Sequence, residues 1–309
     1  MNGHIPVLLE ECIKYLNIKP DGVYVDGTLG MGGHSEAILQ RLTTGRLISI
    51  DRDELAIERA GERLKAYSER LTIVHGNFRD LDEILDEQGV TAVDGMLFDL
   101  GVSSPQLDEG SRGFSYMLDA PLDMRMDKAD NIDAWFIVNR WPEEKIMRIL
   151  RDYGEERHAA RIAKAIAARR EEKEIQTTTE LVEVIKAAMP AAALREKQHP
   201  AKRSFQAIRI AVNDELGAVA AMMDSAPDRL KQGGRLCVIS FHSLEDRIVK
   251  NAIHARENGC TCPREAPVCT CGFVQTLRSV TRKPITAGGE ELELNPRSRS
   301  AKLRVAERV

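Results

Sequence analysis

The sequence predicts an α/β protein in which an open, largely parallel sheet is interrupted by an inserted helical domain. A short apolar run from Val23 to Asp26 passes into a glycine-rich turn and then into a helical pattern. Three of the first four predicted strands end in aspartate, which is typical of a ligand-binding sheet edge. Residues 100–234 separate the fourth strand from the fifth, far more than one helix and its loops require.

Length and composition indicate a globular protein. At 309 residues the chain suffices for about two domains, and 43% hydrophobic residues suffice for a core. The N-terminus lacks the features of a secretory signal, and no apolar run approaches the roughly 20 residues that span a bilayer. We therefore expect a soluble, cytoplasmic protein without a membrane partner. The net charge of −4 leaves only local basic patches for nucleic acid.

The glycine-rich turn is the first candidate binding site. Gly27, Gly30, Gly32 and Gly33 follow the strand and precede the helix. Glycines permit positive φ and carry no Cβ, so a carboxylate or phosphate can lie against backbone amides there. The alternative is a tight strand-to-helix turn without a ligand, which four glycines beside an acid make less favourable.

Asp51 is the second candidate. It ends the apolar strand Arg46–Asp51, about 20 residues beyond the glycine turn, where nucleotide-binding α/β folds hold the ribose hydroxyls. The alternative role is to cap the next helix, but Asp53 can supply that cap.

Two further strands extend the same edge. Leu71–His75 is followed by Phe78, which either packs against a flat base or belongs to the core. Val93–Asp99 is the fourth strand. Because the carboxyl ends of parallel strands share one edge, we expect Asp26, Asp51 and Asp99 to converge on one crevice.

The fifth strand, Arg235–Phe241, follows the Gly233-Gly234 turn, and the inserted span before it reads as helical. Helix signals are Pro142 before two glutamates, the run 157–170, a capping box formed by Thr177 and Glu180, and an amphipathic helix from Lys202 to Leu216. One face of this last helix carries Arg203, Gln206, Arg209 and Asn213, and it is either solvated or lines the crevice. His242, just past the fifth strand, either contacts substrate or orients its loop.

The last part of the chain carries two further signals. Cys260, Cys262, Cys269 and Cys271 cluster within a short segment, which indicates either a zinc site or reduced thiols in a loop. From Arg278 to Val309 basic residues outnumber acidic ones, which makes this stretch a candidate for phosphate contacts.

A glycine turn followed by a ribose acid serves both nicotinamide dinucleotides and S-adenosylmethionine. The turn departs from the dinucleotide fingerprint at its last position, where Ser35 stands in place of glycine or alanine. S-adenosylmethionine fits better, with its carboxylate on the glycine amides, its ribose on Asp51 and its adenine on Phe78.

At the level of whole motifs the sequence closely resembles the bacterial RsmH (MraW) family. The matching segments are Asp26–Ser35, Phe98–Asp108, Arg203–Leu216 and Ser240–Asp246, and the match extends along essentially the whole chain. The resemblance implies an S-adenosylmethionine-dependent methyltransferase that acts on the N4 amino group of a cytosine in the decoding centre of 16S ribosomal RNA. It also implies a Rossmann-like methyltransferase domain, 1–108 and 217–309, with an inserted helical domain, 109–216, for RNA recognition. The implied cofactor-binding residues are Gly32, Gly33, His34, Asp51, Phe78, Asp99 and Gln106.

The implied reaction is direct transfer of a methyl group from sulfonium to nitrogen, which requires an oriented amine and acceptors for the developing charge. The acidic or amide motif usual in amino-methyltransferases is absent after the fourth strand, so we expect Ser103, Ser104 and Pro105 to supply hydroxyls or backbone carbonyls instead. The target base must be exposed or flipped. For RNA binding we expect Arg203, Arg209, Asn213 and His242, together with the basic C-terminal stretch.

The partner is 16S ribosomal RNA within the small ribosomal subunit, and the sequence leaves monomer and homodimer open. Two other functions stay open from the residues alone. One is a nicotinamide-dependent oxidoreductase, and the other is a non-enzymatic RNA-binding or assembly factor. The intact strand-end acids argue against the second.

Overall fold

The computed structural model describes residues 5–102, 106, 110–263 and 270–309. The chain divides into two compact units. Unit 1 comprises residues 1–101 and 216–309, and unit 2 comprises residues 102–215. The sequence placed these boundaries at 108/109 and 216/217.

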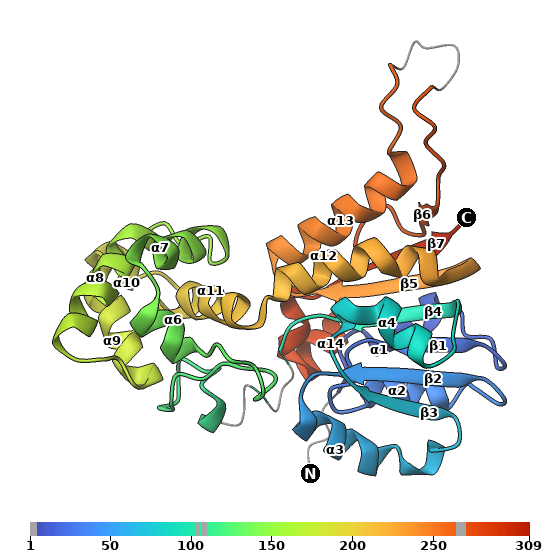
Figure 1. Ribbon diagram of the computed structural model, residues 1–309, viewed down its shortest axis with the longest axis horizontal. Helices are drawn as coiled ribbons and strands as arrows, with labels where there is room; N and C mark the ends of the chain where they lie inside the picture. Colours follow the sequence, from blue (N-terminus) through green and yellow to red (C-terminus); the bar gives the residue numbers. More distant parts are fainter. Residues whose placement is uncertain (1–4, 103–105, 107–109, 264–269) are drawn as a thin grey trace. The chain divides into compact units, whose positions relative to one another are not determined.

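Unit 1 is built on a seven-stranded sheet with the order β3-β2-β1-β4-β5-β7-β6 (Figure 1). Its strands are β1 (Val23–Asp26), β2 (Arg46–Asp51), β3 (Leu71–His75), β4 (Val93–Asp99), β5 (Leu230–Ser240), β6 (Leu277–Ser279) and β7 (Lys302–Arg308). The first five strands are parallel, and β7 runs antiparallel to both β5 and β6. The predicted class, a Rossmann-like α/β fold with a helical insertion, is confirmed. The antiparallel β7 distinguishes this sheet from the 3-2-1-4-5-6 order of dinucleotide-binding folds.

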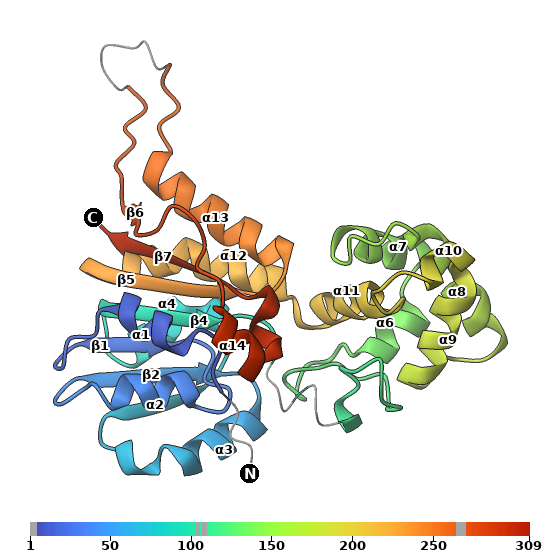
Figure 2. The same ribbon diagram turned by 180° about the vertical axis from the view of Figure 1, so that it is seen from behind.

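Helices cover both faces of the sheet (Figures 1 and 2). They are α1 (Leu9–Leu16), α2 (Gly33–Leu39), α3 (Glu54–Arg63), α4 (Leu81–Glu87), α12 (Glu215–Ser225), α13 (Ser243–Asn258) and α14 (Gly289–Leu294). One apolar cluster joins the sheet to α4, α12 and α13. A second joins the other face to α1, α2 and α3. Both faces of the central strands are therefore buried, which explains why β4 reads as an almost continuous apolar run.

The predicted bounds of the first four strands are confirmed, but the fifth strand differs. β5 begins at Leu230, ahead of the glycine pair that was expected to form a turn before it. Its pairing with β4 shifts register between Val93 and Gly95, and Gly233 has φ of 77°. A glycine with positive φ accommodates such an irregularity, so the strand continues through it.

Unit 2 is helical. Its helices are α6 (Ala134–Arg140), α7 (Glu143–Asp152), α8 (Ala159–Glu172), α9 (Thr178–Ala188), α10 (Ala191–Leu194) and α11 (Lys202–Asn213). They enclose an apolar core of their own. The predicted helix start after Pro142 and the capping box of Thr177 and Glu180 are both confirmed.

The helix predicted from Lys202 to Leu216 is wrong in its extent. It ends at Asn213, because Asp214 adopts a left-handed conformation with φ of 46°. A second helix, α12, begins at the next residue. The apolar spacing continues across this break, which is why periodicity alone did not locate it.

Among the described residues, no helix is both long enough and apolar enough to cross a bilayer.

Candidate functional site

The glycine loop, residues 26–35, is bound to the ends of three strands. Asp26 is fully buried at the end of β1 and accepts hydrogen bonds from the Thr28 amide (3.1 Å) and from Ser35 Oγ (2.7 Å). Ser49 Oγ of β2 lies 2.8 Å from Ser35 Oγ. Burial raises the pKa of Asp26. Asp26 therefore faces inward and fixes the loop, which makes it a positioning residue.

Asp51, at the end of β2, is held by two backbone amides. Its Oδ2 accepts from Gly30 N (2.7 Å) and its Oδ1 from Asp53 N (2.9 Å). An ionised carboxylate offers about four acceptor sites, so each oxygen retains capacity for a ligand hydroxyl. Burial raises the pKa of Asp51 to about 6, although these two amides act in the opposite direction. Asp53 is the residue that caps α3, through Leu55 N, as the sequence suggested.

Asp99, at the end of β4, completes the edge. Its backbone amide donates to Thr28 Oγ1 (2.6 Å), so the glycine loop also bonds to this strand. The side chain is 23% exposed, and its Oδ1 is buried without a hydrogen-bond partner in the described part of the chain. Burial, followed by the negative charges of Asp26 and Glu245, raises the pKa of Asp99 well above its ordinary value. This edge therefore carries acidic groups that a cationic ligand would stabilise.

His34, in the first turn of α2, lies against the same acid. Its Nε2 is 3.0 Å from the carbonyl oxygen of Val7, and its Nδ1 is 3.8 Å from Asp99 Oδ2. If Nε2 carries the proton and donates to Val7, Nδ1 is the acceptor of the neutral ring. The imidazole is buried. It therefore joins the N-terminal segment to the acidic edge.

The two predicted cofactor glycines have different structural causes. Gly32 has φ of 76° and precedes α2, a backbone conformation that favours glycine. A Cβ on Gly33 would lie 2.3 Å from Pro6 Cγ, so the absence of a side chain there permits close packing of the N-terminal segment. Packing against Pro6 thus explains the glycine at position 33, so not every glycine of this loop is evidence that a ligand approaches its backbone.

Phe78 follows β3 and lies in a one-turn 3-10 helix capped by Asn77. Its ring packs edge-to-face on Phe98, with centroids 5.8 Å apart, and it is only partly buried. Both alternatives drawn from the sequence are therefore compatible with its position, since the ring belongs to a core cluster and keeps some exposure.

The remaining predicted cofactor-binding and catalytic residues follow β4 in the sequence. Gln106 is buried and belongs to unit 2. Ser103, Ser104 and Pro105, the expected catalytic residues, lie outside the described residues. Their roles stay predictions.

His242 is engaged in its own helix. It caps α13 in a reciprocal capping box with Glu245, whose carboxylate accepts from the amides of Phe241 (2.8 Å) and His242 (3.2 Å). Of the two roles that the sequence left open, this geometry favours orientation of the loop.

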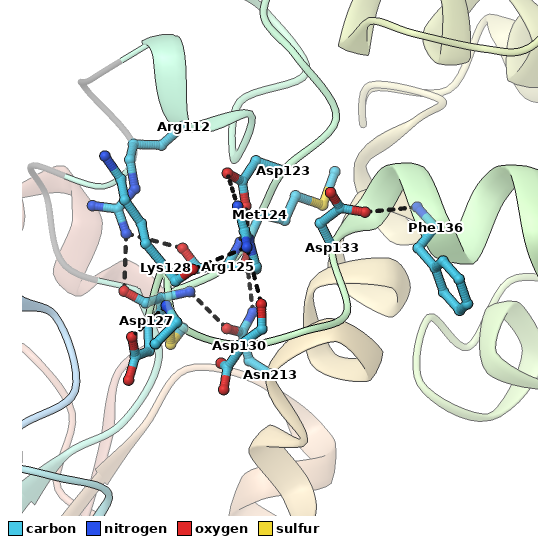
Figure 3. A network of polar contacts seen from close by, with 12 residues as sticks. Arg112, Asp123, Met124, Arg125, Asp127, Lys128, Asp130, Asp133, Phe136 and Asn213 are labelled. Atoms are coloured by element: carbon cyan, nitrogen blue, oxygen red, sulfur yellow. Dashed lines mark hydrogen bonds and ion pairs between the residues drawn. The ribbon is translucent and has the colours of Figure 1, made fainter.

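A polar network in unit 2 includes Asn213, one of the predicted RNA-binding residues (Figure 3). Asn213 is 2% exposed; its Oδ1 accepts from Met126 N (2.8 Å), and its Nδ2 donates to the carbonyls of Met124 (2.8 Å) and Arg209 (2.9 Å). Arg209 pairs with Glu215 through two hydrogen bonds, of 2.7 and 2.8 Å. Both side chains therefore act within the unit.

Two arginines also bind the backbone of the segment around Met124 and Met126 that Asn213 contacts. Arg112 donates to the carbonyls of Arg125 (2.9 Å) and Met126 (3.0 Å). Arg125 pairs with Asp123 and donates to the carbonyls of Lys128 (3.0 Å) and Asp130 (2.9 Å). Figure 3 shows these contacts along one irregular segment between Asp123 and Asp133. The segment is thus fixed by side chains rather than by regular backbone pairing.

The C-terminal stretch uses much of its positive charge internally. Arg278 pairs with Glu307, Lys302 and Arg304 pair with Asp246, and Arg308 pairs with Asp228. Arg282, Lys283 and Arg299 are exposed and form no ion pair within the described chain. The surface available for phosphate contacts is therefore smaller than the sequence suggested.

Sequence reasoning missed Thr28 and the N-terminal segment 5–8. Thr28 bonds to both Asp26 and Asp99, and its position inside the glycine motif was the available signal. The segment 5–8 is held by α14, since Leu8 N donates to Glu291 Oε1 (2.8 Å), and no sequence signal marks this contact.

Three of the four clustered cysteines come together. The Sγ atoms of Cys260, Cys262 and Cys271 lie within 4.8 Å of one another, whereas Cys269 lies outside the described residues.

The comparisons with known proteins agree on one family. The model of the MraW methylase family matches residues 1–309. The chain is 55% identical over 307 residues to the protein named Ribosomal RNA small subunit methyltransferase H of Brevibacillus brevis, covering 99% of this chain and 98% of that relative. Identically named proteins of Heliobacterium mobile and Clostridioides difficile are 54% identical over 308 residues and 53% over 307 residues, each covering 99% of both chains.

Replacing Asn213 by alanine is expected to lower the free energy of unfolding by about 2–4 kcal/mol, because buried groups of Met124 and Met126 lose their partner. Asn251→Ala, at an exposed position on α13, serves as the control and is expected to change it by less than about 0.5 kcal/mol. Urea denaturation of both variants measures the difference. Unchanged stability together with lost RNA binding would contradict the positioning role and favour a direct RNA contact.

Proposed function

The chain belongs to the MraW methylase family, and from this premise we propose that it transfers a methyl group from S-adenosylmethionine to the N4 amino group of a cytosine in the decoding centre of 16S ribosomal RNA. The small-subunit RNA substrate follows the names of the relatives, and the N4 position and decoding centre follow the motif resemblance. Such RNA is made and assembled in the cytoplasm, where we expect the protein to act, on the RNA within the small subunit.

The single observation that carries the cofactor proposal is the acidic edge bound by the glycine loop. Asp51 retains acceptor capacity for two ribose hydroxyls, and Asp99 Oδ1 is a buried acceptor that has no hydrogen-bond partner among the described residues. S-adenosylmethionine brings two positive groups, a sulfonium and an ammonium, to such an edge. The pyrophosphate of a nicotinamide dinucleotide would instead bring negative charge beside acids whose pKa is already raised. The edge therefore favours the cationic cofactor.

In the proposed mechanism the cofactor would supply an electrophilic methyl group, whose bond to sulfur breaks, with the electron pair returning to sulfur, as the bond to the N4 nitrogen forms. The protein positions the reactants: the loop amides would hold the carboxylate of the cofactor, Asp51 its ribose, and the partly exposed ring of Phe78 its adenine. Positive charge develops on the amine during transfer, and acceptors placed beside the amine stabilise that charge. We assign this task to hydroxyls or backbone carbonyls of Ser103, Ser104 and Pro105, which also accept the hydrogen bond of the departing proton before water takes it.

RNA binding is assigned chiefly to side chains that the protein does not use internally. Arg203 on α11 is partly exposed and forms no ion pair in the described chain, as is also true of the exposed Arg282, Lys283 and Arg299. We propose that these four contact phosphates, while Arg209, Asn213 and His242 shape the surfaces around them.

The decisive experiment maps methylation. Small subunits prepared without this modification are incubated with purified protein and S-adenosylmethionine, and the 16S RNA is digested and analysed by mass spectrometry. One added methyl group on a decoding-centre cytosine, with the fragment pattern of N4 substitution, is expected. Methylation of another position overturns the specificity, and hydride exchange with NADH without methyl transfer overturns the enzyme class.

Cofactor affinity should depend on pH through Asp51. Ionised Asp51 accepts the ribose hydroxyls, so protonation competes with binding as pH falls below the pKa of about 6. Calorimetric titration should give a constant Kd between pH 7 and 8 and up to about a tenfold weaker Kd per unit below pH 6.

Asp51→Asn is expected to bind weakly at every pH, without this slope. If the slope persists in Asp51→Asn and disappears in Asp99→Asn, the titrating group is Asp99 and the assignment to Asp51 is wrong.

Arg203→Glu should weaken binding to 16S RNA about tenfold, because a phosphate contact is lost and repulsion is introduced. Arg203→Lys keeps the charge and serves as the matched control. Filter binding measures RNA affinity, and calorimetry measures cofactor affinity, which both variants should retain. An equal loss of cofactor affinity in Arg203→Glu would remove Arg203 from the RNA surface.

A further inference from the structure

Between α13 and β6 the chain leaves the body of unit 1 in an excursion, whose described residues are 259–263 and 270–276 (Figures 1 and 2). No described residue of the excursion is buried, and Val274 is 74% exposed. Its two arms meet near their base, where the Phe273 ring packs over Gly259 and the Thr276 amide donates to the Arg256 carbonyl (3.1 Å). A segment without a core needs another source of order, such as a disulfide or a metal.

The cysteines lie beyond this base, on both arms. Cys260 and Cys262 belong to the outgoing arm and Cys271 to the returning arm. Cys260 Sγ and Cys271 Sγ are 3.6 Å apart, and the three sulfur atoms lie within 4.8 Å of one another. Thiolates placed tetrahedrally around zinc at 2.3 Å are about 3.8 Å apart. The Cys260–Cys271 separation is therefore close to one edge of a zinc–thiolate tetrahedron, and the third sulfur lies near this pair.

The returning arm also contacts the sulfur of Cys262. The Thr270 amide donates to Cys262 Sγ (3.2 Å), and Thr270 Oγ1 lies 3.7 Å from the same sulfur. Amide hydrogen bonds to sulfur also orient a thiolate toward a metal. Thr270 of the returning arm thus orients the sulfur of Cys262 on the outgoing arm.

We propose that Cys260, Cys262 and Cys271 bind a zinc ion that joins the two arms of the excursion. A disulfide would use two of these sulfurs and leave the third without a role, whereas a metal uses all three. Three protein ligands with water in the fourth position is a recognised zinc geometry. Each thiol that binds releases its proton to solvent, so the affinity falls as the pH falls. The site is independent of the acidic edge and of methyl transfer.

The first experiment measures metal content. Full-length protein without an affinity tag, purified with reductant and without chelator, is analysed for zinc by elemental mass spectrometry. About one zinc ion per chain is expected. The double variant Cys260→Ser/Cys271→Ser and the single variant Cys262→Ser should lose it. Cys237→Ala, which removes a buried thiol of β5 outside the cluster, is the matched control and should retain it.

Two further readouts separate the metal site from a structural effect of the substitutions. Cobalt added to the reduced, zinc-free protein should give thiolate-to-cobalt charge-transfer bands that the cysteine variants lack. Zinc should also slow proteolytic cleavage within the excursion of the unsubstituted protein, while the Tm of the body stays the same in the variants of Cys260, Cys262 and Cys271.

Absence of metal binding by the reduced protein overturns the proposal. So does zinc binding that survives loss of the cysteines, or a Cys260–Cys271 disulfide in protein that holds no metal. None of these results bears on methyl transfer, which is measured separately.

Discussion

Hydrogen bonds between the glycine loop and the ends of β1, β2 and β4 are the constraint on which unit 1 depends. Burying carboxylates costs free energy unless they are hydrogen-bonded, and the loop supplies such bonds to Asp26 and Asp51 from its amides and hydroxyls. Gly30 binds Asp51, while Thr28 binds both Asp26 and the amide of Asp99. The bonds do not remove the cost completely, because the pKa values of all three acids remain raised. The loop is thus fixed and the edge carries acids that positive charge would stabilise, which is the basis of the cofactor site proposed above.

The parts of the chain most distant in sequence support the same loop. Pro6 packs on Gly33 and the Val7 carbonyl bonds to His34, while Glu291 of α14 binds the amide of Leu8. The C-terminal strand β7 also inserts between β5 and β6 and brings its basic residues onto internal acids. The end of the chain therefore stabilises the fold around the loop. Much of the positive charge of this arginine-rich region is balanced by acidic side chains of the same chain, whose net charge is −4.

In unit 2, too, polar side chains are used to hold the backbone. The segment around Met124 has left-handed backbone at Met124 itself, with φ of 61°, and is held by Asn213 and Arg112. Because these contacts occupy side chains that the sequence had suggested for RNA binding, the proposed RNA contacts are left to the few exposed cations that form no ion pair among the described residues, and to surface shape. Shape-based recognition is common for folded RNA, and it requires a rigid surface of the kind such a network provides.

The sequence by itself determined the first four strands, the acids that end them, the glycine loop, the helical insertion and the capping box at Thr177. These features depend on local periodicity and on side chains that act within a few residues, so they are visible along the chain. The alternation of Lys302, Leu303, Arg304 and Val305 is also typical of a strand, and this stretch forms β7. Only its positive charge entered the predictions made from the sequence. The tertiary structure alone decided the break at Asp214, the continuation of β5 through its glycines, and which arginines form ion pairs with acidic side chains of the same chain. Those outcomes depend on partners far away in sequence, and a pattern of residue types does not specify which distant partner a backbone or a charged side chain will meet.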